Sequence, residues 1–242
     1  MEEVLRIEAL VVLRDGRRTI DGLNLRLGRG CVYALLGGNG AGKTTTIDVL
    51  LGFVRPHAGT VTVDGWAPAL HAREARQRLA YLPENVALYP YLSGVENLEY
   101  FCALAGIRLD RTQARALLDD AGLQADAHCR RVQAYSKGMR QKVGLAIAHA
   151  KGASAMLLDE PTSGLDPAAA NDFTRRVHAA ADGGMSVLMA THDLFNARQV
   201  ADRIGILRQG RLVAEFDAHS VGHDELEQTY LRHARAGGEA AP

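Results

Sequence analysis

The residues from 37 to 44 are the ones most clearly suited to chemistry. They read Gly-Gly-Asn-Gly-Ala-Gly-Lys-Thr and match the phosphate-binding pattern G-x-x-x-x-G-K-[ST] at every fixed position. Glycines let the backbone wrap closely around a polyanion and point its N–H groups inward. Lys43 would add a positive charge for the β- and γ-phosphates, and the Thr44 hydroxyl is the expected magnesium ligand. The predicted nucleotide-binding residues of this loop are Gly37, Gly38, Asn39, Gly40, Ala41, Gly42, Lys43, Thr44 and Thr45.

The chain on either side of the loop supports the same interpretation. A glycine-rich turn can match the pattern by chance, but residues 31–36 form an apolar run that is typical of a buried parallel strand. Residues 44–51 then predict a helix whose positive N-terminal dipole faces the phosphates. Strand, loop and helix together predict a site for a nucleotide and magnesium.

A second set of candidate residues follows two later strands. Residues 155–159 are an apolar strand that ends in Asp159, and Glu160 comes next. Ligands of parallel sheets bind at the carboxyl ends of the strands. Asp159 is therefore predicted to hold magnesium, and Glu160 to orient and deprotonate the attacking water, although alone the pair could equally be two solvated acids. His192 follows the predicted strand 186–190 and could donate a hydrogen bond to the γ-phosphate, but a lone histidine is more often a surface or core residue.

These residues need a scaffold, and the apolar pattern predicts an α/β fold. From residue 34 onward strands alternate with helices, which indicates a parallel sheet with crossover helices. Short runs near the N-terminus indicate a small antiparallel sheet beside it, and helices alone over 93–150 indicate an inserted helical subdomain. The further predicted strands are 5–13, 23–27, 59–65, 203–207 and 211–216, and the further predicted helices are 93–104, 110–121, 136–150, 167–181 and 194–201.

The bulk composition limits the possible partners. The chain has 242 residues, and its 28 basic side chains balance 28 acidic ones, so no overall basic field favours nucleic acid. Its three cysteines are far apart and are expected to be reduced thiols. The sequence has no secretory signal and no apolar run near the about 18 residues of a membrane span, so any link to a bilayer is expected through another protein.

In their order along the chain, these motifs resemble those of the nucleotide-binding subunit of ATP-binding cassette (ABC) transporters. Residues 135–139 are similar to the family's signature Leu-Ser-Gly-Gly-Gln, and residues 163–166 resemble its D-loop. The resemblance implies a P-loop NTPase core in 1–92 and 151–218 within a cassette of residues 1–220, and a C-terminal tail over 219–242. The signature residues are Tyr135, Ser136, Lys137, Gly138 and Met139, and the D-loop residues are Ser163, Gly164, Leu165 and Asp166.

The resemblance implies that two cassettes work together. In the family two domains pack head to tail, and each signature closes on the γ-phosphate held by the phosphate loop of the other. Ser136 and Gly138 would open a helix and present free N–H groups to that phosphate, whereas an ordinary capped helix is the alternative. ATP would join the dimer, and hydrolysis would release it.

Three positions depart from the family pattern. Arg14 stands where an aromatic residue usually stacks on adenine; an arginine plane can also stack on a base, or the contact is weak or made by another residue. Glu84 replaces a glutamine that contacts magnesium and water, and its charge could bind the metal more tightly yet repel phosphate. Lys137 replaces a glycine and would add positive charge near the opposing phosphates, where it would offset Glu84.

The implied function is an ATPase that energises a separate membrane permease, and the signature and the segment around Glu84 look most like the exporter-type branch. The implied partners are the permease and a second cassette, identical or related, and the implied location is the cytoplasmic face of the inner membrane, reached through the permease. A soluble, non-transport ABC ATPase that acts as an assembly scaffold is the alternative. A regulator that barely hydrolyses ATP is a third possibility, against which Glu160 argues.

Aromatic residues concentrate between positions 81 and 101, where the family receives a short helix of the membrane subunit. We expect Tyr89, Tyr91 and Leu92 at that interface, and Tyr100 and Phe101 inside the helical subdomain. The end of the tail is expected to be frayed. Its loosely spaced histidines are expected to be solvated rather than metal ligands: His219, His223 and His233.

Overall fold

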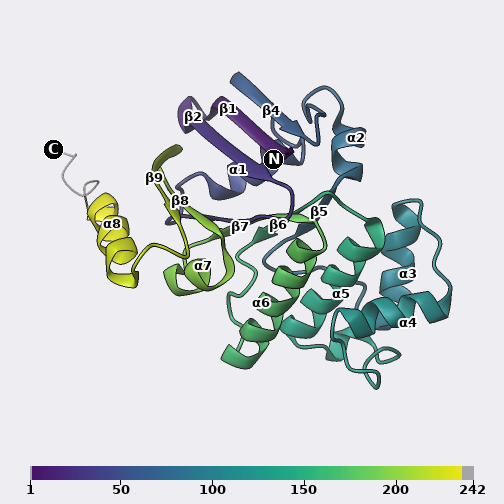
Figure 1. Cartoon of the computed structure of the whole chain (residues 1–242). Helices are drawn as coiled ribbons and strands as arrows, with labels where there is room; N and C mark the ends of the chain where they lie inside the picture. Colours follow the sequence, from purple (N-terminus) through teal and green to yellow (C-terminus); the bar gives the residue numbers. More distant parts are fainter. Residues whose placement is uncertain (1, 236–242) are drawn as a thin grey trace.

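The computed structural model describes residues 2–235, and its centre is a six-stranded sheet in the order β5-β6-β7-β3-β8-β9 (Figure 1). Five strands are parallel, as the alternating pattern predicted, and β9 (Arg211–Asp217) pairs antiparallel with β8 at one edge. A tight turn at Gln209 and Gly210, both with positive φ, joins these two strands. The parallel strands are β3 (Val32–Leu36), β5 (Leu79–Leu82), β6 (Ala155–Asp159), β7 (Ser186–Thr191) and β8 (Arg203–Arg208).

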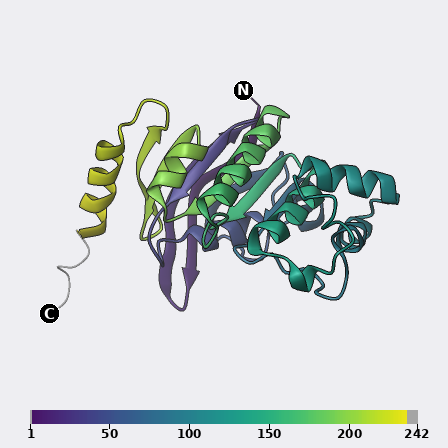
Figure 2. The same ribbon diagram turned by 90° about the horizontal axis from the view of Figure 1, so that it is seen from below.

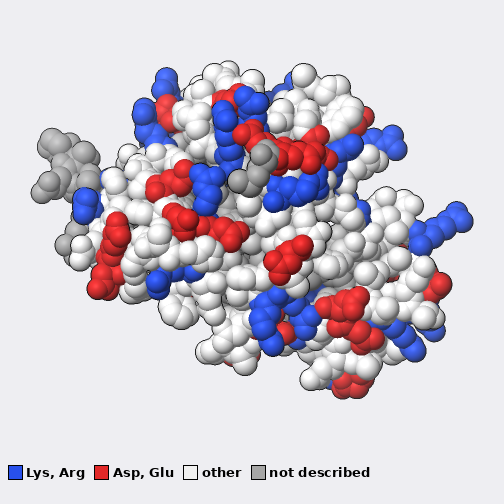
Figure 3. All heavy atoms as spheres, viewed as in Figure 1, with Lys and Arg blue, Asp and Glu red and all other residues white. Residues whose placement is uncertain are grey.

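A second, three-stranded antiparallel sheet confirms the prediction for the N-terminal part of the chain. Its order is β2-β1-β4, and β1 and β2 form a long hairpin that turns at Asp15 and Gly16. Acidic and basic side chains are interspersed on the molecular face shown in Figure 3. Arg26 of β2 forms ion pairs with Glu3 and Glu8 of β1. The three strands are β1 (Glu3–Arg14), β2 (Arg17–Gly28) and β4 (Ala58–Val63).

The predicted helical subdomain is present on one side of the main sheet, at the lower right of Figure 1. Its helices begin at the expected caps: Ser93 and Glu96 form a capping box at α3, and Asp110 caps α4. None of the described helices is long and apolar enough to cross a membrane. The helices are α1 (Lys43–Leu50), α2 (Ala72–Gln77), α3 (Gly94–Leu104), α4 (Arg111–Asp120), α5 (Lys137–Lys151), α6 (Pro167–Asp182), α7 (Leu194–Val200) and α8 (His223–Arg235).

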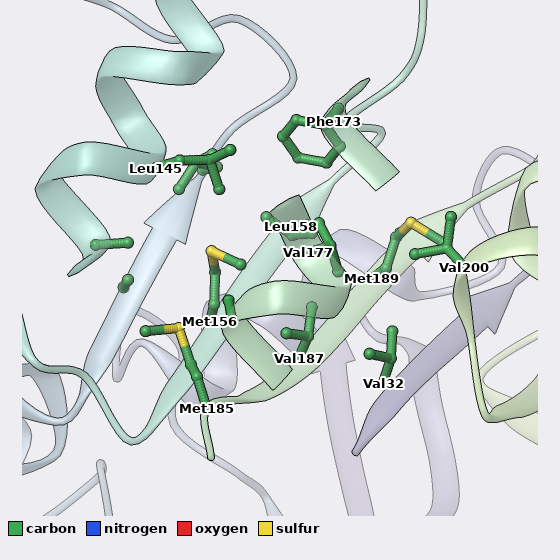
Figure 4. Close-up of a cluster of buried hydrophobic side chains, with 14 of the residues drawn as sticks. Val32, Leu145, Met156, Leu158, Phe173, Val177, Met185, Val187, Met189 and Val200 are labelled. Carbon is green, nitrogen blue, oxygen red and sulfur yellow. The ribbon is translucent and has the colours of Figure 1, made fainter. Parts of the chain in front are cut away.

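The main sheet separates two hydrophobic cores, because successive side chains of a buried strand point to opposite faces. On β3, Tyr33 and Leu35 point toward the antiparallel sheet and α1, whereas Val32 and Leu36 point toward the helices. Figure 4 shows part of the helix-side core, where residues such as Phe173 from α6 meet the strand side chains. Both ends of the phosphate loop are therefore anchored on packed elements, β3 before it and α1 after it.

Three elements were not predicted from the sequence: α2, β5 and α8. The last lies within the segment interpreted as a tail, and it packs on α7 and β8, with Leu226 fully buried (yellow in Figures 1 and 2). The helix is mostly polar, but its few apolar residues recur with helical spacing, a signal that the interpretation of this segment as a tail overlooked. The expectation of a frayed chain end concerns residues 236–242, which lie outside the described residues.

Candidate functional site

The phosphate loop connects β3 to α1 and is supported from behind by the β8–β9 turn. Gly42 has a φ of 112°, and a Cβ on it would lie 2.7 Å from Cδ1 of Ile20 and 2.8 Å from the carbonyl oxygen of Thr19. A Cβ on Gly37 would lie 2.6 Å from the carbonyl oxygen of Leu207. Only glycine fits at these two positions, so the close wrapping predicted from the motif is enforced by packing.

Lys43, the first residue of α1, is only 7% exposed and its ammonium points back into the loop. Its Nζ donates to the carbonyl oxygens of Gly37 at 2.6 Å and Gly38 at 3.3 Å, and it lies 3.4 Å from a carboxylate oxygen of Glu160. A buried lysine needs such partners. The same charge is therefore in place for a polyanion cradled by the loop.

The acid pair follows β6, and its two carboxylates face different partners. One oxygen of Asp159 lies 3.4 Å from the Thr44 hydroxyl, across from α1. Glu160 has a φ of 45°, which is uncommon for a residue with a side chain. One of its oxygens faces Lys43, and the other accepts from the Thr191 hydroxyl at 3.1 Å and lies 2.9 Å from Nδ1 of His192.

The pKa of the Asp159 carboxyl lies above its ordinary value. Burial of the carboxyl is the largest cause, and the adjacent charge of Glu160 adds to it, whereas Lys43 and the Thr44 hydroxyl act in the opposite direction. A group of this kind is stabilised by a nearby cation. The nucleotide-free site thus concentrates more negative charge than its own lysine neutralises.

Thr44 and Asp159 fit the requirements of magnesium. They offer a hydroxyl and a carboxylate oxygen, which are hard ligands, on the side of the loop where phosphate oxygens would complete the coordination. Among residues 2–235 no cluster of three or more His, Cys, Asp or Glu could hold a metal by itself. A metal ion that is shared with phosphate oxygens needs only one or two protein ligands, and Thr44 and Asp159 could supply them.

Two of the residues that depart from the family pattern lie at the rim of this pocket. Arg14 ends β1, and its guanidinium is paired at 2.7 Å with Asp48 of α1. Glu84 follows β5 and accepts a hydrogen bond from Ser163 at 3.2 Å. The cavity measures about 390 Å³ and is lined by Arg14, Thr19, residues 38–45, Glu84, Asp159 and Glu160.

The signature segment opens α5, and none of its residues is among the described residues that line this cavity, although Lys137 lies 3.6 Å from the lining residue Glu84. Ser136 is exposed and caps the helix, accepting from the backbone N–H of Met139 at 3.3 Å. Gly138 packs against the side chains of Leu165 and Ala169 at distances of 3.6 Å from its would-be Cβ. The N-terminal end of α5 therefore faces the surface, next to the D-loop.

Other residues of the signature and the D-loop contact neighbouring parts of the fold or cap a helix. Tyr135 is 4% exposed, and its hydroxyl donates to the carbonyl oxygen of Ala127, so its ring packs the helical subdomain instead of facing an opposing phosphate. The Met139 sulfur is contacted by Arg130. Asp166 caps α6 by accepting from the Ala169 N–H at 2.9 Å, and Gly164 has a φ of 69°.

The aromatic residues after β5 lie partly as expected. Tyr89 and Tyr91 are 47% and 76% exposed. Tyr100 was expected inside the subdomain, but it is 39% exposed and its ring lies edge-on to Tyr89 at 4.8 Å, because α3 turns this face outward. Phe101 is half-buried next to both rings.

Sequence reasoning missed three residues that contact the site. Thr191 binds Glu160, and only its position next to His192 could have indicated it. Asp48 pairs with Arg14. Gln141 is 1% exposed and its amide donates to the carbonyl oxygen of Pro161, the residue after Glu160, so it connects α5 to the acid pair.

The arrangement of fold and phosphate loop defines a P-loop nucleoside triphosphatase. The ABC transporter family model matches residues 20–163. The chain is 38% identical over 213 residues to the daunorubicin/doxorubicin resistance ATP-binding protein DrrA of Streptomyces peucetius, covering 87% of this chain and 64% of that protein. It is 39% identical over 225 residues to DrrA3 of Streptomyces coeruleorubidus, covering 92% of this chain and 67% of that protein. The chain therefore belongs to the ABC transporter family.

Solved structures agree with this assignment. A structure described as the ATP-binding subunit of an ABC transporter superposes with a TM-score of 0.81 at 28% identity, covering 94% of this chain and 99% of that chain. The fold also matches that of a dimeric ATP-binding cassette, MJ0796, bound to ADP and phosphate, with a TM-score of 0.77 at 21% identity and coverage of 90% and 100%. The chain spans about two thirds of the length of the curated relatives named above.

Proposed function

We propose that this chain is the ATP-hydrolysing subunit of an exporter-type ABC transporter and drives a separate membrane permease. The names of its relatives support the direction of transport: the DrrA proteins are resistance proteins, and another relative, from Burkholderia lata, is a Nod factor export ATP-binding protein at 35% identity. These relatives favour a transporter over a soluble assembly scaffold. The peripheral location at the inner membrane is part of the same proposal.

The observation that carries the proposal is the surroundings of Glu160. Its carboxylate lies at the mouth of the phosphate loop, where Lys43, Thr191 and His192 fix both oxygens. A carboxylate held in this way can accept a proton from a water molecule while that water attacks the γ-phosphorus and the bond to the ADP oxygen breaks. His192 would orient Glu160 and contact the transferred phosphoryl group.

The remaining residues of the pocket would bind the substrate. The N–H groups of residues 38–45 and the Lys43 ammonium would hold the phosphates, and the planar guanidinium of Arg14, paired with Asp48, would face the base. Thr44 and Asp159 would hold magnesium, with Glu84 nearby. The bound ion would neutralise charge that develops on the β- and γ-oxygens.

A second cassette is part of the proposal because none of the signature residues 135–139 is among the described residues that line the pocket. Ser136 is exposed and residues 137–139 are half-buried, and the first N–H groups of a helix have no partner within the helix, which suits an anion. A second copy, or a relative, would bring this end to the γ-phosphate, together with its D-loop, residues 163–166.

The permease would contact the exposed tyrosines of the segment before α3 and of α3 itself. Tyr89, Tyr91 and Tyr100 form an aromatic surface in which the hydroxyls of Tyr89 and Tyr100 are 3.2 Å apart. Tyrosine is enriched in protein interfaces because it combines apolar area with a polar end. Co-purification of the tagged chain from membranes with a hydrophobic helical partner is expected, and recovery only with soluble assembly factors would favour the scaffold.

The test of the chemistry is Glu160→Gln. The variant keeps the size and shape of the side chain, but it replaces one accepting oxygen with an NH₂ group and cannot take a proton from water, so turnover should fall about 10²–10⁴-fold. ATP binding should persist, and the variant should accumulate as an ATP-dependent dimer in light scattering, whereas Lys43→Ala should abolish both. Wild-type turnover in Glu160→Gln would contradict the role of Glu160.

A further inference from the structure

The rim of the nucleotide pocket carries one carboxylate more than its metal and its chemistry need. Glu84, Asp159 and Glu160 all line the cavity, and Lys43 is the lysine among the lining residues. Arg14 also lines it, but its guanidinium is already paired with Asp48. A triphosphate that enters this pocket would meet the charge of Glu84 without a cation in the cavity wall to balance it.

The counter-charge comes from outside the cavity. Nζ of Lys137, the first residue of α5, lies 3.6 Å from Oε1 of Glu84, in the same chain. The same oxygen accepts the hydrogen bond from Ser163 at 3.2 Å. A single carboxylate oxygen thus joins three segments: the turn after β5, the start of the signature helix and the D-loop.

The exposure of the two side chains shows what kind of pair this is. Lys137 is 24% exposed and Glu84 is 48% exposed, so water screens their attraction. Pairs of this kind contribute little to folding stability. Their charges nevertheless act on the phosphates of a nucleotide that enters the pocket beside Glu84. The pair is therefore better suited to setting the electrostatic potential of the pocket than to stabilising the fold.

We infer that Lys137 is a positioning residue that neutralises Glu84 within the same chain, so that a glutamate can stand beside the phosphates. The sequence alone predicted that Lys137 would add positive charge near the opposing phosphates of a second copy and offset Glu84 there; the contact with Glu84 lies instead within one chain. This inference rests on the proposed function, since it concerns the same nucleotide pocket. The two departures from the family pattern, Glu84 and Lys137, therefore depend on each other, and changing one residue changes the effect of the other.

The experiment measures the dissociation constant of Mg·ATP at protein concentrations at which the chain is monomeric. Lys137→Met leaves Glu84 uncompensated and should weaken binding about two- to fivefold, the range expected for an exposed pair. Glu84→Gln should bind as tightly as wild type or more tightly. The double variant Glu84→Gln, Lys137→Met should return to within about twofold of wild type, and the loss in Lys137→Met should shrink at high salt.

Lys142 provides the matched control. It lies on the same helix, is also 24% exposed and pairs with Asp172 at 2.8 Å, away from the pocket. Lys142→Met removes the same charge, and its Mg·ATP affinity should equal that of wild type. If Lys142→Met weakens binding as much as Lys137→Met does, the effect is one of net charge and the inference is overturned.

Two further outcomes would overturn the inference. Wild-type affinity in Lys137→Met would show that Glu84 needs no counter-charge. A double variant as weak as Lys137→Met would show that the lysine acts on phosphate directly. In both cases wild type still binds Mg·ATP and Lys43→Ala does not, so the proposed function survives. Failure of the wild-type chain to bind Mg·ATP would instead overturn the proposed function and this inference together.

Discussion

Asp159 shows most clearly the conflict between stability and chemistry at the level of single residues. Its carboxyl is half-buried next to Glu160, and both conditions disfavour the charged form. A ligand-free protein would be more stable with a neutral side chain there. The residue is suited to a site that is completed only when a cation binds with the substrate.

This argument predicts the pH dependence of an Asp159→Asn variant. A raised folded-state pKa gives stability that is fully present below the unfolded-state value and is lost as pH rises through the folded value. The nucleotide-free variant should therefore melt roughly 1–3 °C above wild type at pH 7, and the advantage should disappear as the carboxyl protonates in acid. Thermal unfolding at several pH values measures this, and a variant less stable than wild type at pH 7 would contradict it. Magnesium-dependent turnover should be lost.

At the level of elements, α5 connects the signature segment to the acid pair, Asp159 and Glu160. It begins at the signature segment, and Gln141 ties it to the segment that carries Glu160. The amide oxygen of Gln141 is buried without a partner among the described residues, whereas its NH₂ group donates to the carbonyl oxygen of Pro161. A rearrangement of α5 would therefore act on the acid pair through this amide.

Two substitutions of Gln141 should separate packing from hydrogen bonding. Gln141→Met removes the donor and the unpartnered oxygen together, so the free energy of unfolding should change by no more than about 1 kcal/mol. Gln141→Glu places an oxygen against the carbonyl of Pro161 in a buried position and should cost roughly 2–4 kcal/mol. Urea denaturation distinguishes the two, and equal losses would show that the amide is not a specific connection.

The sequence predicted where the phosphate loop and the acid pair lie in the fold, but not which residues contact them. The phosphate loop and the β6 strand before Asp159 are local patterns, so their placement followed from neighbouring residues. Tyr135 could not be placed in this way, because its burial depends on Ala127 and on the packing of the helical subdomain. The same holds for Thr191, which meets Glu160 only because β6 and β7 are neighbours in the sheet.

On the scale of the whole molecule, the last described helix belongs to the nucleotide-binding body. It packs on α7 and β8, and its Tyr230 lines a cavity of about 320 Å³ with Gly38, Asn39 and Gly40. A Cβ on Gly38 would lie 3.9 Å from the Tyr230 hydroxyl. Its sequence is mostly polar, but its few apolar residues lie on one face, and the packing of that face on α7 and β8 accounts for its position.

The buried residue of α8 provides a test of this role. Leu226 is fully buried, and Leu226→Ala should reduce the free energy of unfolding by about 2–4 kcal/mol. Leu231 lies on the same helix and is 39% exposed, so Leu231→Ala should cost no more than about 0.5 kcal/mol. Chemical denaturation compares the two variants, and equal, small effects would mean that α8 is not part of the core.

The neighbourhood of Tyr230 and Gly38 has an evolutionary consequence. Tyr230 lies 192 residues after Gly38 in the sequence and borders it in space, although it belongs to none of the motifs described above. A substitution of Tyr230 can therefore change the affinity for ATP while every motif stays the same. Relatives with identical motifs can differ in nucleotide affinity for this reason.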